Sequence, residues 1–573
     1  MIRPLIASLA ALVLTACASV PAGPAAPSSD LAPLTVRIIG INDFHGNLLP
    51  HKRKSDAGPL TPDGRAIDAP VGGAAVLATA VRQLRAQNSD SLVISAGDLI
   101  SASPLVSSLF LDEPSIGVMN RIGLEFNAVG NHELDRGWQE LLRMQNGGCE
   151  QFGLREPCQV ENPFEGADFP FLAANVTRPD GSLLLPAYGI RHFGSGEREV
   201  AVAVIGLPLR GVPALVSPTG IEGLNFGDEA DAINALVPKL LDEGADAIIV
   251  AIHQGFEADG YYDSGDDCGG AIGPLNDILK RLDPRVDLVI SGHTHRYFIC
   301  EYSQFDPTRD FLVTSTGYGS GMVADLVVTI DPAKHDVRVK AAEMVIVQSE
   351  DPNFRRFAPD PEIAAYVAQY EQASRAAAER PVGRISGPAR EDGWENALGN
   401  MIADAQLAAT RANGAQIAFM NEGGVRTDLV PETADGTVTF AQIYAVQPFG
   451  NVLMTMDLTG AQIAAALEQQ FTVPDAPEVL SVSDGFTYRL DRTKPVGQRV
   501  SDMRLDGTPI VSDARYRVTV NSFLAGGGDR FTVFAEPENK TIGPVDLDSF
   551  EAWIDGEGGR ALPATDRITL IGG

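Results

Sequence analysis

The chain has few cysteines and few basic side chains. Only five of its 573 residues are cysteine, and no two of them form a C-x-x-C pair, which disfavours a cysteine-based zinc site. Lysine and arginine total 44 against 75 aspartate and glutamate, for a formal net charge of −31. This charge argues against a nucleic-acid polymer as a partner, because most of the surface would repel a phosphate backbone. A small anion held by a local metal cluster is still compatible with it.

The first residues have the pattern of an export signal. Arg3 is followed by an apolar run, residues 5–14, that is too short to span a bilayer as a helix, and no later stretch is long and apolar enough. Leu14-Thr15-Ala16-Cys17 resembles a bacterial lipobox with Cys17 as the lipid attachment site. An ordinary secretory signal with a chance cysteine is the alternative. We expect an exported lipoprotein of the periplasm or cell envelope, anchored to the outer membrane, without an obligate protein partner.

The other cysteines form an even set of four, as is common in exported proteins. We therefore expect two disulfides. Three pairings are possible on paper, and one of them closes two local loops without crossing between domains. In that pairing, Cys149 bonds Cys158 and Cys268 bonds Cys300.

The first half of the chain repeats one design: an apolar, β-branched run ends, and polar residues able to bind a metal follow at once. Segments between these runs, such as residues 73–87 and 230–241, have helical apolar spacing. Strands and helices therefore alternate, which predicts an α/β layered domain. The predicted strands that lead into polar residues are 36–41, 91–95, 126–129, 247–252 and 288–290.

The polar residues at these strand ends predict a metal site. Ligands of open α/β sheets lie outside the carboxyl ends of the strands, so five strand ends can bring their side chains together. A helix cap or turn residue is the alternative for each side chain alone, but not for the joint pattern. Carboxylate, imidazole and amide oxygen without thiolate suit two divalent ions such as zinc, manganese or cobalt, with Asp98 as a bridge. The candidate ligands are Asp43, His45, Asp98, Asn131, His253, His293 and His295.

Two further residues suggest the chemistry. His132 follows the candidate ligand Asn131 and is free to stabilise a transition state, and Asp135 is placed to orient its imidazole and favour the protonated form. Two metal ions can bind a shared water, lower its pKa and direct the hydroxide at a phosphorus atom.

Four motifs in this half resemble the signature of calcineurin-like metallophosphoesterases: Asp43-Phe44-His45, Gly97-Asp98, Gly130-Asn131-His132-Glu133 and Gly292-His293-Thr294-His295. The resemblance implies His132 and Asp135 as a catalytic dyad. Some relatives carry glutamine at the position of His295, a difference expected to affect metal preference more than reaction type. The family resemblance also implies that one metal is held by Asp43, His45, Asp98 and His295, and another by Asp98, Asn131, His253 and His293.

The second half begins with an alanine-rich amphipathic helix over residues 360–381, with Ile363, Ala364, Val367 and Tyr370 on one face, which predicts a linker between domains. A new α/β pattern follows. Its glycine-rich segments offer a guanidinium, two phenylalanines, and Asn and Asp side chains, a set that suits a nucleoside. Plain core packing is the alternative for either phenylalanine. The segments are residues 398–405, 419–426, 446–451 and 520–529.

Together these segments resemble the carboxy-terminal domain of the 5'-nucleotidase family, which includes UDP-sugar hydrolases and ecto-5'-nucleotidases. Many relatives have a further substrate arginine near Gly399, where this chain has Trp394, with Arg390 further upstream; which of them, if either, replaces that arginine is open. In this family the two domains rotate against each other to bring the nucleotide to the metals. The resemblance implies Asn421 and Arg426 as polar substrate contacts, Phe449 and Phe523 as a base sandwich, and Asn451 and Asp529 as base or ribose contacts.

The predicted organisation is a lipoprotein signal at residues 1–17, a flexible tether at 18–34, a metallophosphoesterase domain at 35–350, a linker helix at 351–382 and a substrate domain at 383–573. We expect an enzyme that releases phosphate from nucleoside 5'-monophosphates by attack of a metal-bridging hydroxide. Alternatives are 2',3'-cyclic nucleotides, UDP-sugars or NAD as substrates, sulfur linkages on a carrier protein, and a lipoprotein that captures nucleotides without cleaving them. A broken ligand set would indicate the last, and none is broken.

Overall fold

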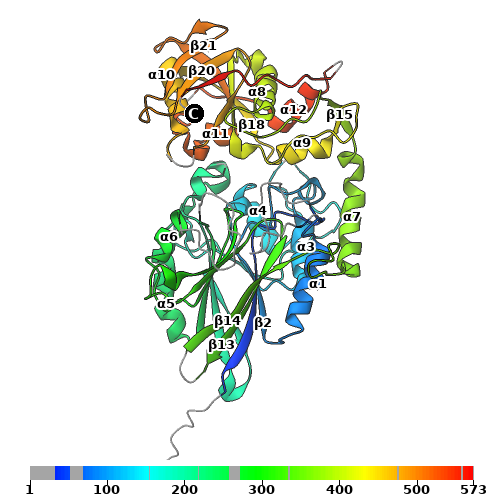
Figure 1. The fold of residues 1–573 in the computed structure, drawn as a ribbon, viewed down its shortest axis with the longest axis vertical. Coiled ribbons are helices and arrows are strands. Elements are labelled where there is room, and N and C mark those ends of the chain that lie inside the picture. Colours follow the sequence, from blue (N-terminus) through cyan, green and yellow to red (C-terminus); the bar gives the residue numbers. More distant parts are fainter. Residues whose placement is uncertain are drawn as a thin grey trace, which may run out of the picture.

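The computed structural model describes residues 32–571 except 52–66, 68, 154, 217, 257–271, 333–335, 474–476, 538 and 557–558. The predicted signal, Cys17 and most of the tether lie outside the described residues. Two domains lie one above the other, with the long helix α7 (Pro361–Ala378) along one side of them (Figure 1). Among the described helices, none combines the length and apolar character needed to cross a membrane.

Two six-stranded sheets form the N-terminal domain. Parallel pairing joins β1 through β4 in one sheet, and β7, β9, β10 and β12 in the other, while antiparallel strands complete both. The first sheet contains β14 (Asp336–Ile346), β13 (Met322–Asp331), β1 (Leu34–Ile41), β2 (Ser91–Ser95), β3 (Phe126–Ala128) and β4 (Phe171–Leu172). The second contains β11 (Tyr297–Glu301), β12 (Leu312–Thr316), β10 (Leu288–Ser291), β9 (Ala247–His253), β7 (Val200–Pro208) and β6 (Tyr188–Phe193).

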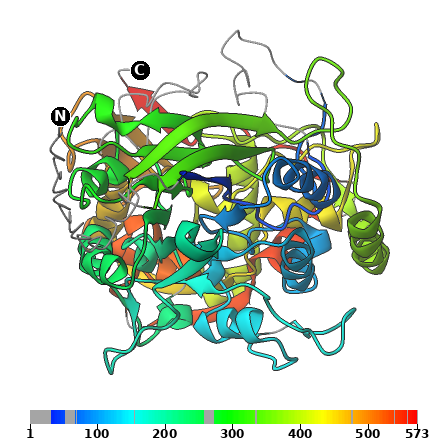
Figure 2. The ribbon, with the colours of Figure 1, turned by 90° about the horizontal axis from the view of Figure 1, so that it is seen from below.

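The two sheets pack face to face between outer layers of helices. Alternation along β1 divides its side chains: Val36 and Ile38 pack between the sheets, whereas Ile39 and Ile41 pack against the helices. The helices α1 (Ala74–Arg85) and α3 (Glu113–Ile122) cover the first sheet, and α5 (Glu229–Asp242) and α6 (Pro274–Leu279) cover the second (Figures 1 and 2). The predicted α/β layered domain is confirmed.

One disulfide of the N-terminal domain is described. Cys149 bonds Cys158, which closes a short loop after α4 (Trp138–Asn146), as predicted. The second predicted pair includes Cys268, which lies outside the described residues, so that pairing stays a prediction.

The predicted linker helix is present as α7. Asp360 caps its N-terminus by accepting from the backbone N–H groups of Glu362 and Ile363. Its buried face contains Ile363, Tyr366, Val367 and Tyr370; Ala364 is exposed, so its predicted position on that face is wrong. Tyr366 and Tyr370 pack into the core of the N-terminal domain, whereas Ala378 at the end of the helix packs against the C-terminal domain, so α7 contacts both domains.

The C-terminal domain contains a five-stranded and a four-stranded sheet with helices around them (Figure 1). The larger sheet contains β19 (Leu480–Val482), β16 (Ile417–Asn421), β23 (Arg515–Asn521), β18 (Val452–Thr459) and β24 (Thr541–Val545). The smaller contains β22 (Thr508–Pro509), β21 (Val500–Leu505), β20 (Phe486–Asp491) and β25 (Ile568–Ile571). The helices are α8 (Ala397–Thr410), α9 (Phe440–Val446), α10 (Gly460–Gln469), α11 (Ser522–Ala525) and α12 (Asp546–Ile554).

Candidate active site

The seven candidate metal ligands lie at the carboxyl ends of five strands. Asp43 and His45 follow β1, Asp98 follows β2 and Asn131 follows β3. His253 is the last residue of β9, and His293 and His295 follow β10. Because these strands belong to both sheets, the site lies at one edge of the sandwich, as expected for ligands of parallel strands.

The structure brings these side chains together around Asp98. Its Oδ2 lies 3.0 Å from Nε2 of His253 and 3.6 Å from Nε2 of His45. Asp43 Oδ1 lies 3.4 Å from Nε2 of His295 and 3.8 Å from Nε2 of His45. Asp98 belongs to one group of candidate ligand atoms with His45 and His132 and to another with Asp43 and His253, as a bridging carboxylate would.

Two imidazoles are oriented by backbone carbonyls. Nδ1 of His45 lies 2.9 Å from the carbonyl oxygen of Ser101, and Nδ1 of His253 lies 2.8 Å from that of Ala96. Donation from Nδ1 leaves Nε2 as the metal-binding atom. Both Nε2 atoms are buried without a hydrogen-bond partner. Both nitrogens lie 3.0–3.8 Å from carboxylate oxygens of Asp98 or Asp43, so this donor set fits divalent cations.

Burial and charge separate the protonation states of the histidines. Burial lowers the pKa of His45 and of His293 to about 3, so both rings are neutral at pH 7. Burial also lowers the pKa of His253, but the neighbouring Asp98 carboxylate more than offsets this and raises the pKa to about 10. A cation at this position therefore competes with a proton on His253.

The backbone of the ligand loops is unusual. Five of the seven candidate ligands adopt a positive φ, a region that side chains other than glycine rarely enter. Each such residue costs about 1 to 3 kcal/mol and persists only where the surroundings hold it, which is typical of functional sites. These ligands are Asp43, His45, Asp98, His293 and His295, with φ values from 45° to 77°.

The predicted dyad forms beside the ligand cluster. His132 Nδ1 lies 2.7 Å from Asp135 Oδ2, and the backbone N–H of His132 donates to Asp98 Oδ1 at 2.9 Å. Burial lowers the pKa of His132, but the carboxylates of Asp135 and Asp98 outweigh it, so the pKa is raised. His132 is thereby placed to act as a protonated imidazole.

Two residues without a predicted role also shape the cluster. The buried Glu133 carboxyl group accepts backbone N–H groups from Gly130, Asp98 and Leu99 at 2.6–2.9 Å, which ties two ligand loops together. Its place in the Gly-Asn-His-Glu motif was a signal for such a role. The ring of Tyr318 lies 4.9 Å from that of His295 and 5.4 Å from that of His45. Nothing in the sequence around Tyr318 indicates this contact.

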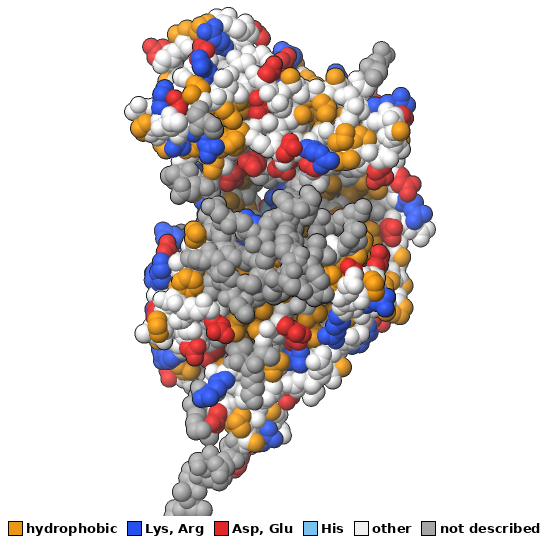
Figure 3. All heavy atoms as spheres, in the orientation of Figure 1, with side chains coloured by type: hydrophobic (Ala, Val, Ile, Leu, Met, Phe, Trp, Pro, Cys, Tyr) orange, Lys and Arg blue, Asp and Glu red, His pale blue; other side chains and the backbone are white. Residues whose placement is uncertain are grey.

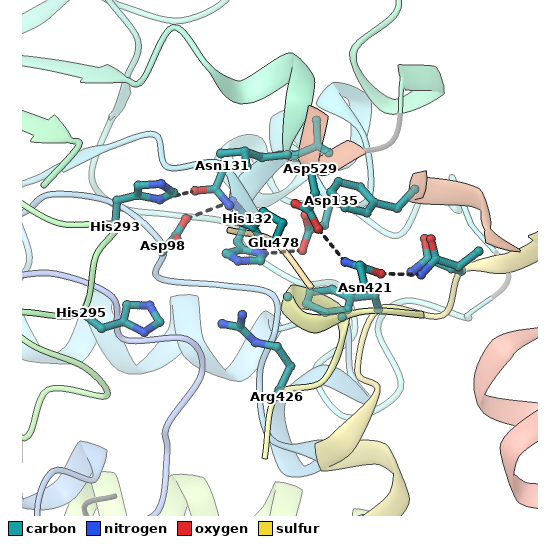
Figure 4. A pocket seen from close by; sticks show the side chains of 18 residues that line it. Asp98, Asn131, His132, Asp135, His293, His295, Asn421, Arg426, Glu478 and Asp529 are labelled. Atoms are coloured by element: carbon teal, nitrogen blue, oxygen red, sulfur yellow. Dashed lines mark hydrogen bonds and ion pairs between the residues drawn. The ribbon is translucent and has the colours of Figure 1, made fainter. Parts of the chain in front are cut away.

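A cavity between the domains connects the cluster with the C-terminal domain (Figure 4). Acidic and basic side chains gather along the edge of the C-terminal domain that faces the N-terminal domain (Figure 3). From the N-terminal domain the cavity is lined by Asp98, Asn131, His132, Asp135, His293 and His295. All six predicted substrate residues line it from the other side: Asn421, Arg426, Phe449, Asn451, Phe523 and Asp529.

The substrate residues are held by a hydrogen-bond network and by stacking. Asn421 donates from Nδ2 to Asp529 Oδ2 at 2.7 Å and accepts from Asn521 Nδ2 at 2.9 Å. Burial raises the pKa of Asp529 to about 6. The ring of Phe449 stacks on that of His132, with centroids 5.8 Å apart and 11° between the planes. The guanidinium of Arg426 lies 5.8 Å from the Phe449 centroid.

The two candidates for the missing family arginine have partners elsewhere. Arg390 pairs with Asp428, and Trp394 stacks on Phe471. Neither lines the cavity, whereas Glu478 and Asn521, which had no predicted role, do. Asn521 ends β23 directly before the segment that carries Phe523, so its position in the motif was a usable signal.

Comparison with known proteins gives matches over both domains. Residues 36–297 match the calcineurin-like phosphoesterase family, and residues 376–536 match the 5'-nucleotidase C-terminal domain. Endonuclease YhcR of Bacillus subtilis is 32% identical over 91% of this chain, which spans 39% of that protein. Cell wall protein Lmo0130 of Listeria monocytogenes is 30% identical over 91% of this chain and 67% of its own length.

Solved structures agree with these matches. The 5'-nucleotidase precursor from Thermus thermophilus superposes with a TM-score of 0.73 at 25% identity, covering 94% of this chain and all of that one. The sandwich with its ligand cluster is thus a calcineurin-like metallophosphoesterase domain. With its C-terminal domain, the chain belongs to the 5'-nucleotidase family of hydrolases.

Proposed function

We propose that this protein is a metal-dependent 5'-nucleotidase that removes phosphate from nucleoside 5'-monophosphates. The observation that carries the proposal is the shared cavity, which is lined by candidate metal ligands and the dyad on one side and by Arg426, Phe449 and Phe523 on the other. One nucleotide can place its phosphate against the side formed by the N-terminal domain, the first wall, and its nucleoside against the side formed by the C-terminal domain, the second wall. The name of the Thermus relative, a 5'-nucleotidase precursor, supports this substrate class.

Two divalent cations fit the residues present. Asp43, His45, Asp98 and His295 would hold one cation, and Asp98, Asn131, His253 and His293 the other. When bound, such a pair supplies charge stabilisation and an activated water for attack on phosphorus. The donor set without thiolate suits zinc, manganese or cobalt.

The protein's own groups orient the substrate and stabilise charge. His132, kept protonated by Asp135, presents Nε2–H to the charge that develops on the phosphoryl or leaving oxygen. Arg426 lies close enough to His132 to lower its pKa, so its cation also acts on this region of the cavity. Phe449 and Phe523 provide faces for a base, and Asp529 and Asn451 provide acceptors for ribose or base donors.

A substrate panel tests the proposal. The purified protein is assayed with AMP, 2',3'-cyclic AMP, UDP-glucose, NAD and single-stranded DNA, each with and without chelator. We expect phosphate release from AMP with the largest kcat/KM, loss of it after chelation, and recovery with zinc, manganese or cobalt. If no phosphate is released from AMP, or if full activity remains after chelation, the proposal is overturned. The DNA arm is included because the Bacillus relative is named an endonuclease, whereas the net charge of −31 disfavours polymers.

We further propose that the protein is exported and anchored to the outer membrane by a lipid on Cys17. The lipobox-like Leu14-Thr15-Ala16-Cys17 supports the lipid anchor, and the name of the Listeria relative, a cell wall protein, supports export alone. Labelling of cells with a radioactive fatty acid should mark the wild type and leave Cys17→Ser unlabelled. Equal labelling of both would refute the anchor.

A further inference from the structure

A left-handed turn between β2 and α2 (Leu105–Ser108) contacts the dyad. Ser101, in this turn, has φ 67° and is 5% exposed, and Ala102 beside it has φ 46°. Consecutive residues of this kind, neither of them glycine, are costly and need the surrounding structure to hold them. Ser101 is neither a candidate metal ligand nor a member of the dyad.

The polar groups of Ser101 contact two parts of the active site at once. Its Oγ donates to Asp135 Oδ2 at 2.6 Å, the same oxygen that lies 2.7 Å from Nδ1 of His132. Its backbone carbonyl lies 2.9 Å from Nδ1 of His45. A single residue therefore orients the carboxylate of the dyad and a candidate metal ligand.

A buried ion pair holds Ser101 in place. Asp112 Oδ2 accepts from the backbone N–H of Ser101 at 3.0 Å and from Nη1 of Arg136 at 2.7 Å, and Oδ1 accepts from Ser107 Oγ at 2.6 Å. Burial raises the pKa of Asp112, but Arg136 and the hydroxyl donors outweigh this and lower it. Asp112 thus remains an anion that fixes the turn.

We propose that Ser101 is a positioning residue that aligns the His132–Asp135 dyad with the metal ligand His45. Its hydroxyl sets the rotamer of the Asp135 carboxylate and, through it, the plane of the His132 ring. Its carbonyl keeps the His45 proton on Nδ1 and directs Nε2 toward Asp98 and Asp43. The inference rests on the proposed function, which gives His132 and Asp135 their catalytic roles.

Ser101→Ala tests the hydroxyl alone, because the carbonyl that contacts His45 remains. We expect kcat for AMP to fall about tenfold, the loss typical of one hydrogen bond to a charged group, with KM changed by less than about twofold. Bound metal, measured by atomic emission, should stay at the wild-type level. In a crystal structure of the metal-free variant, the distance from His132 Nδ1 to Asp135 Oδ2 should exceed the present 2.7 Å. An unchanged kcat with an unchanged dyad would overturn the proposal.

A double-mutant cycle separates positioning from a general structural role. If Ser101 acts through Asp135, Ser101→Ala lowers kcat no further in an Asp135→Ala background; a second tenfold loss there would contradict the proposal. Ser108→Ala is the matched control, because this serine is also buried and its Oγ donates to the Pro104 carbonyl away from the dyad. Its kcat should match the wild type, and an equal loss in both alanine variants would reduce Ser101 to a structural role.

The same set of variants distinguishes this inference from the proposed function. If Asp135→Ala retains wild-type turnover, the catalytic role of the dyad fails. If Asp135→Ala loses turnover but Ser101→Ala does not, only the role of Ser101 fails.

Discussion

The two walls of the cavity differ in burial and in backbone conformation. The N-terminal wall belongs to the ligand cluster, in which Asp43, His45, Asp98, Asn131 and His253 are at most 4% exposed and five of the seven candidate ligands have positive φ; of these five buried ligands, Asp98 and Asn131 line the cavity. Of the six predicted substrate residues on the C-terminal wall, only Asn421 is that deeply buried, and only Asp529 has positive φ. The ligand cluster behind the first wall is packed into the N-terminal domain, whereas the substrate residues of the second wall are mostly half-buried. We therefore expect all-or-none losses on the first wall and graded losses on the second.

The largest effect is expected at the shared ligand. Asp98→Asn removes the carboxylate that lies between His45 and His253, so kcat/KM should fall roughly 10³-fold or more, together with bound metal. Steady-state kinetics and metal analysis measure both. Asp277→Asn, at an exposed ion pair on α6 of the same domain, is the control and should match the wild type. Graded, partial loss at Asp98 would remove the contrast between the walls.

The dyad should give the next largest effect. His132→Asn leaves the candidate ligands in place but removes the protonated imidazole, so kcat should fall about 10²- to 10³-fold while bound metal stays unchanged. Rapid-quench measurement of phosphate release reports the chemical step directly. Metal loss in this variant would instead assign His132 to the ligand cluster, since its ring nitrogen lies within 4.8 Å of candidate ligand atoms of His45 and Asp98.

Metal affinity should depend on pH through His253. Because Asp98 raises the pKa of His253 to about 10, a cation must displace a proton there at neutral pH. Affinity should therefore increase with pH, up to about tenfold per unit between pH 6.5 and 8, and binding should release a proton. His45 and His293, with pKa values of about 3, add nothing in this range. Calorimetry with manganese in buffers of different ionisation enthalpy measures the released proton; its absence would contradict the assignment.

The sequence predicts the local features of the molecule but not those that depend on contacts between distant segments. The strands and the ligands at their ends are local features: residues 91–95 were predicted as a strand and β2 has the same bounds, and the polar residues follow directly. That the strands form two sheets depends on pairing between distant segments, such as β1 with β13, which no local pattern contains. Ser101 and Tyr318 act through contacts of this kind too, so neither could be found without the structure.

A smaller effect is expected on the C-terminal wall. Phe449→Ala should raise KM for AMP about tenfold through loss of one stacking face, with kcat nearly unchanged. Phe305→Ala, at an exposed aromatic of the N-terminal domain, is the control and should leave both constants unchanged. Phe449 also stacks on His132, so the substitution could act on catalysis instead of binding. A loss in kcat with unchanged KM would show that Phe449 works with the N-terminal wall.

The smallest effect concerns the charge of Asp529. Burial raises its pKa to about 6, so the side chain loses its charge as the pH falls from 7 to 5. If Asp529 accepts hydrogen bonds from ribose or base, KM for AMP should rise severalfold more over that interval in the wild type than in Asp529→Asn, whose pH dependence reports only the groups that remain, the AMP phosphate among them.

The same substitution has an opposite consequence for stability. A carboxyl group whose pKa is higher in the folded than in the unfolded protein destabilises the fold once it ionises, and this cost is complete above pH 6 and absent below about pH 4. Asp529→Asn should therefore raise Tm at pH 8 and leave it unchanged near pH 4, as scanning calorimetry can measure. A gain in stability together with a loss in substrate affinity would show that the second wall, like the strained ligand loops, gives up stability for binding. Equal Tm shifts at both pH values would instead assign Asp529 a purely structural role, as part of its hydrogen bond with Asn421.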